Sequence, residues 1–140
     1  MDGFKVYRRE VTLSTSERFQ LVNITRHVEE IVADSGVREG FVHVFVPHAT
    51  AAVIANEDEG GLKQDFIRLF RELFKPGSGW MHDRIDDNAH AHLAAGVIGA
   101  DRSFPVTGGR IVRGTWQEIF LVELDGPRSR RRVIVTVIGI

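Results

Sequence analysis

The pattern that most limits the fold lies in the C-terminal part of the chain. Three β-rich runs, at residues 110–112, 118–124 and 132–138, follow one another with short connections and no helical segment between them. Strands joined in this way pair antiparallel, because a parallel pair needs a long crossover connection. We therefore expect an antiparallel meander here, and a parallel doubly wound sheet is disfavoured.

The rest of the chain supplies four more strands and three helices. β-branched and aromatic residues predict strands at 4–13, 19–24, 41–46 and 51–55. Helical spacing of apolar residues and end signals predict helices from Thr25 to before Gly36, from Gly60-Gly61 to Lys75, and over 89–98. Strands at both ends with helices between them predict an α+β fold, a mostly antiparallel sheet with about three helices on one side.

Size and charge narrow the class of protein. The 140 residues suit a single domain, 1–140. Eighteen basic and 19 acidic side chains give a net charge of −1, so no nucleic acid or membrane surface is expected as a partner. The absence of cysteine excludes thiolate catalysis, disulfides and cysteine-bound zinc. No apolar run reaches the roughly 18 residues that span a bilayer, and the N-terminus has no signal core, so we expect a cytoplasmic protein.

The segment from His82 to His92 holds three of the six histidines together with three aspartates. Imidazole and carboxylate groups bind zinc and similar metals, and histidine exchanges protons near neutral pH. A solvated acidic turn that leads into a helix is the competing interpretation. Asn88 is a good N-cap, and on a helix Asn88 and His92 share a face while His90 points elsewhere. We therefore favour His92 over His90, a choice that would fail if the segment were a strand.

A second candidate site lies around His48, which follows Pro47 at the end of a predicted strand. Asn56 and Glu57 lie one strand further along the chain, so we expect an amide and a carboxylate near the same edge. A structural role for His48 is the alternative. For Asp58 and Glu59, stabilisation of the following helix dipole explains the charge.

The third candidate is a group of arginines after the turn Asp125-Gly-Pro. Arg128 and Arg130, two apart on a strand, would share a face and could bind phosphate or carboxylate with their planar donors. A solvated basic sheet edge explains the same pattern. Arg131 and Arg132 alternate with this pair. We therefore expect replacement of Arg131 to weaken the binding of phosphate-bearing ligands much less.

Together these segments resemble the YjbQ family, also called secondary thiamine-phosphate synthases. The matching segments are Pro-His48-x-Thr50-Ala-Ala, Asn56-Glu57, Asp65, His82, Asn88-Ala-x-Ala-His92, Gly114-Thr-Trp-Gln117 and Glu123-x-Asp-Gly-x-Arg128-x-Arg130. They follow the family's order and spacing over almost the whole chain. Two positions depart from the pattern: Ala49 stands where the family usually has threonine, and His90 occupies a variable place.

The resemblance implies a small α+β protein that assembles as a homotrimer and has thiamine-phosphate synthase activity. It implies a divalent metal, with zinc expected, on His48, His82 and His92. By the same match Asn56, Glu57 and Asn88 are the expected catalytic residues, and a small phosphorylated metabolite would contact Thr50, Thr115, Gln117, Arg128 and Arg130. Two functions stay open: a transferase that joins a pyrimidine pyrophosphate to a thiazole phosphate, or a trimeric metal- or metabolite-binding protein without significant catalysis.

Overall fold

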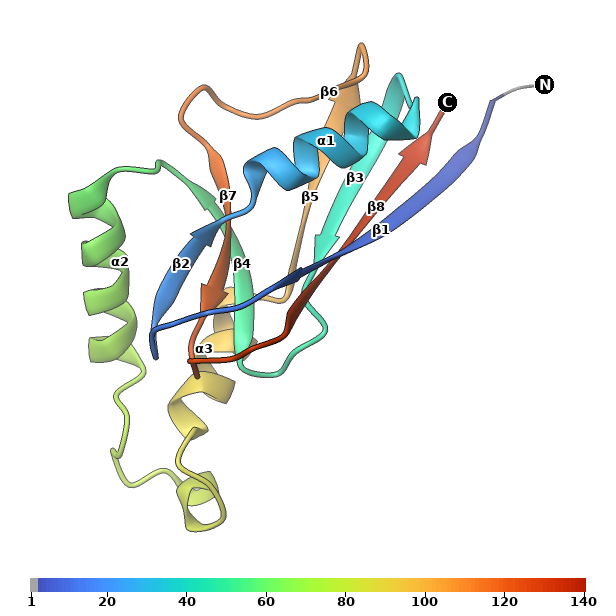
Figure 1. The fold of residues 1–140 in the computed structure, drawn as a ribbon. Helices are drawn as coiled ribbons and strands as arrows, with labels where there is room; N and C mark the ends of the chain where they lie inside the picture. The colour runs from blue at the N-terminus through green and yellow to red at the C-terminus, as the bar shows by residue number, and fades with distance from the viewer. Residues whose placement is uncertain (1–2) are drawn as a thin grey trace.

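The computed structural model describes residues 3–140, which form eight strands and three α-helices (Figure 1). In chain order the elements are β1 (Lys5–Leu13), β2 (Gln20–Asn23), α1 (Thr25–Ser35), β3 (Glu39–Phe45), β4 (Ala51–Asn56), α2 (Gly60–Leu73), the short 3-10 helix η1 (Met81–Arg84), α3 (Ala89–Ile98), β5 (Asp101–Thr107), β6 (Arg110–Ile111), β7 (Glu118–Glu123) and β8 (Arg131–Gly139). The predicted α+β class is confirmed.

The strands form two sheets in which every pair is antiparallel. The five-stranded sheet has the order β1-β8-β3-β5-β6, and the three-stranded sheet has the order β2-β7-β4. The expected meander of the last three strands is wrong. β6 pairs with β5, β7 is the middle of the three-stranded sheet, and β8 lies between β1 and β3, because the chain crosses from one sheet to the other and back.

The hydrophobic core lies on both faces of the three-stranded sheet. Val53, Ile119 and Leu121 on one face pack with α1 and with the valines of β3 and β8. On the other face Ala52 and Val122 pack against α2 and α3. Burial of both faces explains why β7 is apolar at consecutive positions instead of alternating. α1 thus packs with the inner side of the five-stranded sheet, and α2 and α3 cover the three-stranded sheet.

Strand β5 is the one strand that the sequence pattern does not predict, because it contains Pro105 between glycine-rich turns. The carbonyl oxygen of Pro105 accepts a hydrogen bond from the backbone N–H of Val112, on the side away from β3. The nitrogen of a strand residue points to the same side as its oxygen, so the missing N–H of proline removes no bond to β3. β6 pairs only with Val106 and Thr107, which leaves this edge open to proline.

No helix within residues 3–140 is long and apolar enough to cross a membrane.

Candidate functional site

The candidate residues fall into two groups at opposite ends of the three-stranded sheet. Ala51 at the start of β4 pairs with Glu123 at the end of β7, and Asn56 at the end of β4 pairs with Glu118. We call the first end the histidine end, formed by His48, Thr50, His82, Asn88, His92, Glu123, Asp125, Arg128, Arg130 and Arg131. The second is the GTWQ end, formed by Asn56, Glu57 and Gly114 to Glu118.

The two ends are about 17 Å apart, since β7 spans five residue steps of roughly 3.3 Å each. In Figure 1 the β6–β7 connection and the start of α2 lie at the upper end of this sheet, and η1 lies beyond its lower end. The expectation that Asn56 and Glu57 reach the same edge as His48 is therefore wrong within one chain. The reason is simple: His48 precedes β4 and Asn56 ends it.

A buried ion pair between Glu123 and Arg131 forms the base of the histidine end. Glu123 is fully buried and Arg131 is 4% exposed. Arg131 donates from Nε to Glu123 Oε1 at 2.9 Å, and its Nη2 also contacts Oε2. The hydroxyl of Thr15 and the backbone N–H groups of Leu124 and Asp125 donate to the same carboxylate. Burial alone raises the pKa of Glu123, but these donors outweigh it and the pKa is lowered, so the carboxylate is charged at neutral pH.

Arg131 also fixes the segment that carries His48. Its Nη2 donates to the carbonyl oxygen of Thr50 at 3.1 Å and to the Thr50 hydroxyl at 2.9 Å. Arg131 is therefore a structural residue of this end and is unsuitable as the control for Arg128 and Arg130. The register of β8 decides this, because Arg131 is an inward position of the strand and Arg132 an outward one.

His48 is held as a neutral imidazole beside several arginines. Its Nε2 accepts the backbone N–H of Arg132 at 2.8 Å, so the ring proton lies on Nδ1. Burial, and then the positive charges of Arg131 and Arg132, lower the pKa of His48. A neutral ring with one N–H can donate a hydrogen bond without carrying charge.

His82 and His92 lie together, as the sequence predicts. Their ring centroids are 4.7 Å apart in an edge-to-face arrangement. His82 Nε2 is 3.1 Å from Asn88 Oδ1, which can only accept, so this nitrogen carries the proton. With Trp80, Met81, Ala89 and Leu93 the two rings line a cavity of about 330 Å³.

Asn88 links the two histidines to the arginine loop. Its Nδ2 donates to Asp125 Oδ2 at 2.8 Å, and Arg128 Nη2 donates to the same oxygen at 2.7 Å. Asn88 precedes α3 but makes no cap hydrogen bond with its side chain. Asp83 Oδ1 instead accepts the N–H of Ala89 at 3.0 Å, which leaves the Asn88 amide free to join His82 to Asp125.

Arg128 and Arg130 lie in the loop before β8, not on a strand as predicted. Arg128 is bound to the backbone and side chain of Asp125. Arg130 is exposed and makes no ion pair within residues 3–140. Because Arg128 is already engaged, Arg130 is the freer guanidinium for an anionic ligand.

The three histidines expected to share a metal do not form one group in a single chain. Within the described part of the chain no three histidine, aspartate or glutamate side chains are placed to hold one ion. His82 and His92 supply two adjacent imidazoles, whereas Nε2 of His48 is occupied by a backbone N–H. The predicted three-histidine metal site stays a prediction, with His82 and His92 as its adjacent members.

His90 is a core residue. It is fully buried, its ring is 5.4 Å from that of Phe19, and Nε2 donates to the carbonyl oxygen of Leu124 at 3.2 Å. This placement supports the choice of His92 over His90.

At the GTWQ end a tight turn presents an exposed tryptophan. Gln117 closes the turn through two hydrogen bonds with the backbone of Gly114, and Trp116 is 70% exposed. Arg113 braces the turn, since it binds the Gln117 carbonyl oxygen at 2.7 Å and the carboxylates of Glu118 and Glu29 at 2.9 and 3.5 Å. Asn56 Oδ1 accepts the N–H of Glu57, whose carboxylate makes no ion pair with residues 3–140.

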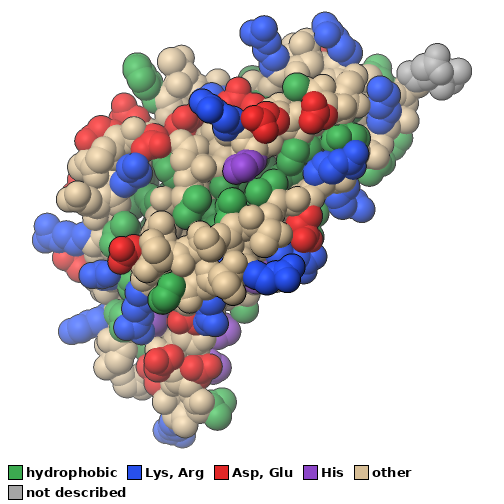
Figure 2. Space-filling view, in the orientation of Figure 1, with side chains coloured by type: hydrophobic (Ala, Val, Ile, Leu, Met, Phe, Trp, Pro, Cys, Tyr) green, Lys and Arg blue, Asp and Glu red, His purple; other side chains and the backbone are tan. Residues whose placement is uncertain are grey.

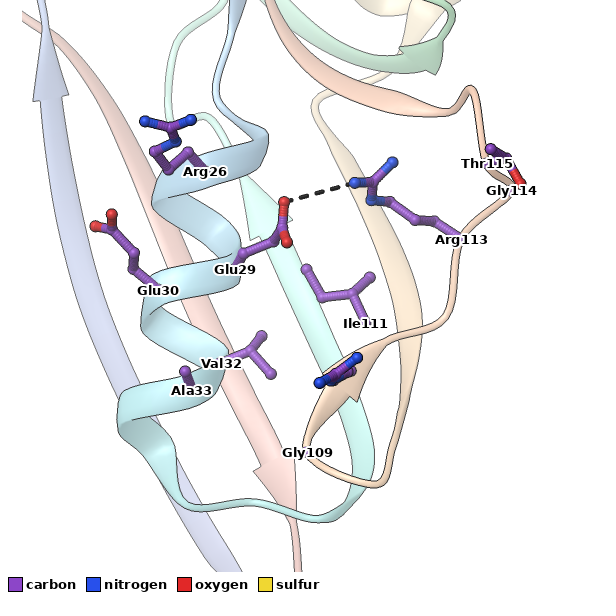
Figure 3. A pocket seen from close by; sticks show the side chains of 11 residues that line it. Arg26, Glu29, Glu30, Val32, Ala33, Gly109, Ile111, Arg113, Gly114 and Thr115 are labelled. Atoms are coloured by element: carbon purple, nitrogen blue, oxygen red, sulfur yellow. Dashed lines mark ion pairs between the residues drawn. The ribbon is translucent and has the colours of Figure 1, made fainter.

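A groove of about 930 Å³ separates this turn from α1. Its lining includes Thr115 and side chains of both charges, three arginines and two glutamates (Figure 3). Arg113 points toward Glu29 across the groove, so part of this charge is internally paired.

Sequence reasoning missed Thr15 and the pairing of Glu123 with Arg131. A signal for this pair is present: Glu123 interrupts an apolar strand, and a buried carboxylate needs a cationic partner.

Comparisons with known proteins agree with the motif match. The sequence profile of the family described as UPF0047 protein YjbQ-like matches residues 9–140. A UPF0047 protein of Archaeoglobus fulgidus is 42% identical over 125 residues, which cover 89% of this chain and 97% of that protein. YjbQ of Escherichia coli O157:H7 is 31% identical over 137 residues, which cover 95% and 98%.

Two solved structures show the same fold. A YbjQ-like protein of unknown function from Sulfolobus solfataricus P2 has a TM-score of 0.97 and 52% identity, covering 98% of this chain and 99% of that one. An uncharacterised conserved protein of the YjbQ/UPF0047 family from Clostridium acetobutylicum has a TM-score of 0.87 and 34% identity, covering 92% and 98%. The chain therefore belongs to the UPF0047 family of YjbQ-like proteins.

Proposed function

We propose that the histidine end binds the phosphate groups of a small metabolite and that the protein is a transferase with thiamine-phosphate synthase activity. The observation that carries this proposal is the grouping of the neutral His48 with the positive charges of Arg131, Arg132 and Arg128 beside the buried Glu123. Arg130 is exposed in the same loop, between Arg128 and Arg131. A preorganised set of donors of this kind suits an anion whose charge grows during a reaction. We expect the protein to act in the cytoplasm.

In this reaction the ring nitrogen of the thiazole phosphate attacks the methylene carbon of the pyrimidine pyrophosphate. A carbon–nitrogen bond forms, the carbon–oxygen bond breaks, and its electron pair leaves with pyrophosphate. Arg130 and Arg128 would hold the departing anion, because guanidinium groups bind phosphate with two parallel hydrogen bonds. The Nδ1–H of His48 would donate to an oxygen of the same anion.

Direct assay of thiamine phosphate from the two precursors tests this proposal. His48→Ala should lower kcat/KM by about 10²-fold, the usual scale for loss of one positioned catalytic donor. His27→Ala is the matched control, since His27 is an exposed imidazole on α1 that belongs to neither end. No product from the wild-type protein, or equal loss in both variants, would refute the activity.

A divalent metal, with zinc as our expectation, would be held first by His82 and His92. The Nε2 proton of His82 leaves its Nδ1 free, and two adjacent imidazoles are a usual part of a zinc site. Elemental analysis of protein purified without a histidine tag should show metal loss in His82→Ala and His92→Ala but not in His48→Ala. Equal metal content in all three variants would remove the metal from the proposal.

A binding role without significant catalysis is the second candidate. It is favoured by one observation: Thr50, Arg128 and His48 already have partners within the chain, which leaves few free groups for chemistry. Tight binding of pyrophosphate without turnover of the two precursors would select this role.

We also propose that the protein assembles as a homotrimer. Supporting this, the outer face of the five-stranded sheet carries a row of exposed apolar side chains from four adjacent strands, Val6, Ile138, Phe41 and Pro105. Contiguous exposed apolar patches of this kind mark protein–protein contacts.

A further inference from the structure

The candidate residues form two incomplete halves in each copy of the chain. The histidine end has the imidazoles and arginines, and the GTWQ end has the exposed turn, Asn56 and Glu57. Both ends are rigid, because the Glu123–Arg131 pair fixes one and the contacts of Arg113 fix the other. About 17 Å of β7 separates them, so no flexing within one chain brings them together.

The histidine end is open as one chain forms it. His82, Arg128 and Arg130 are exposed. Met81 and Leu93, which line the cavity beside the two histidines, are 72% and 42% exposed. Sites for small molecules bury most of the ligand surface. A second surface must therefore cover this end if it binds a metabolite.

The GTWQ end has the properties of such a covering surface. Trp116 is large, exposed and held on a tight turn, and exposed tryptophan is typical of the centre of protein interfaces. The hydroxyl of Thr115 is exposed and has no hydrogen-bond partner within residues 3–140. Figure 2 shows acidic side chains gathered over the start of α2, beside this end.

The charges of the two ends are complementary. Glu57 at the GTWQ end makes no ion pair in the described chain, and neither do Arg130 at the histidine end and Arg84 in η1. If Glu57 lies beside Arg130 and Arg84 of another copy, its carboxylate neutralises one of the two guanidinium groups. The other leaves a net positive charge for an anionic ligand.

We propose that the GTWQ end of one copy of this chain closes over the histidine end of the next copy. The contact joins two different surfaces, so it repeats head to tail, and in the proposed homotrimer it closes into a ring with three sites. Each site then takes His48, Arg128 and Arg130 from one copy, and Thr115 with the Trp116 wall from its neighbour. This inference rests on the proposed function and assigns the GTWQ turn to the phosphate site of another copy.

Trimers that contain two different variants test whether each site is shared between neighbouring copies. One copy carries Arg130→Ala and the other Thr115→Val, each with a different histidine-free tag, and rings that contain both are purified over both tags. Binding of inorganic pyrophosphate is measured by calorimetry. Each variant alone should bind at least about tenfold more weakly than wild type, the usual effect of losing one hydrogen bond to a charged group. A mixed ring of three has one site with both wild-type halves, so about one third of the sites should regain wild-type affinity.

The results separate the two arrangements. If each site lies within one chain, every site in a mixed ring carries one of the two substitutions, and no wild-type affinity returns. That outcome, or unchanged binding by the pure Thr115→Val protein, would overturn the inference.

Cross-linking tests the contact without any ligand. The chain has no cysteine, so Trp116→Cys and Arg130→Cys introduce the only thiols. A short bis-maleimide should join the two variants when they are mixed, yet join neither variant to itself. Cross-links without pyrophosphate binding would retain the contact and refute the proposed function, whereas binding without cross-links would refute the contact alone.

Discussion

The buried pair of Glu123 and Arg131 holds Thr15 and Thr50 in place. Because the pair is buried, it affects the stability of the fold more than the exposed arginines nearby do. Both carboxylate oxygens of Glu123 and the Nε and Nη2 groups of Arg131 are bonded within the protein, to each other and to Thr15, Thr50 and two backbone N–H groups. Removal of one partner leaves the other buried and uncompensated, and it is this loss that is costly.

Arg131→Met should therefore lower the free energy of unfolding by about 3–5 kcal/mol, the usual cost of a broken buried ion pair. Arg132→Met should change it by less than about 1 kcal/mol, because its pair with Glu10 is exposed. Urea unfolding of both variants measures this. If Glu123→Met/Arg131→Met does not recover a large part of the stability lost in Arg131→Met, the uncompensated charge is not the cause.

The same pair predicts how stability depends on pH. The pKa of Glu123 is lowered in the folded protein, while an unfolded glutamate has a pKa of about 4.3. The unfolded state then binds more protons in acid, so the contribution of this pair is complete above about pH 4.3 and is lost as the pH falls through the folded pKa. Urea unfolding between neutral pH and pH 3 should show a smaller loss for the Glu123→Met/Arg131→Met protein than for wild type. Parallel curves would contradict this.

The tract Arg128 to Arg132 shows why the sequence could not fully resolve this region. It predicts a turn and an arginine cluster, and both are present. Which arginine is buried depends on the pairing of Leu13 with Arg131, a contact between residues 118 positions apart (131 − 13). Spacing along the chain carries no information about that register, so the sequence pattern places Arg128 and Arg130 on a strand that begins only at Arg131.

Among the secondary-structure elements, the three helices could be located from local sequence signals alone. α3 begins after Asn88 and ends before Gly99, the positions that the sequence predicts, although Asp83 and not Asn88 accepts the N–H of Ala89. The pairing of the strands could not be predicted in the same way. β7 and β8 are both apolar and β-branched in sequence, yet they belong to different sheets. The two ends of the candidate site follow from this pairing, so their separation could not be predicted from the motifs alone.

The start of α3 gives a prediction of its own. Asp83 accepts the N–H of Ala89, and Asn88 uses its amide for His82 and Asp125. Asp83→Ala should therefore reduce the free energy of unfolding by about 0.5–2 kcal/mol, as loss of a helix cap does. Asn88→Ala should leave this cap intact and free the His82 ring, which nuclear magnetic resonance of the histidine side chains can detect. If Asn88→Ala leaves the His82 signals unchanged, Asn88 does not orient this ring.

At the scale of the whole molecule, the two sheets place one rigid polar cluster at each end of a shared central strand. The family motifs include residues of both the histidine end and the GTWQ end, but the motifs alone do not reveal that the two ends lie apart in one chain. Within the described residues the histidine end combines a neutral imidazole with exposed arginines, so we expect anionic ligands to bind there.

Binding of pyrophosphate by the Arg130→Ala and Arg132→Ala proteins tests whether anions bind at the histidine end. Both changes remove one exposed arginine, and the backbone N–H of Arg132 that binds His48 remains in its variant. We predict that Arg130→Ala weakens binding by about 1.5–3 kcal/mol, or roughly 10- to 150-fold in Kd, and that Arg132→Ala changes it less than about threefold. Equal, small effects that disappear in moderate salt would show only a solvated basic edge and would contradict the account.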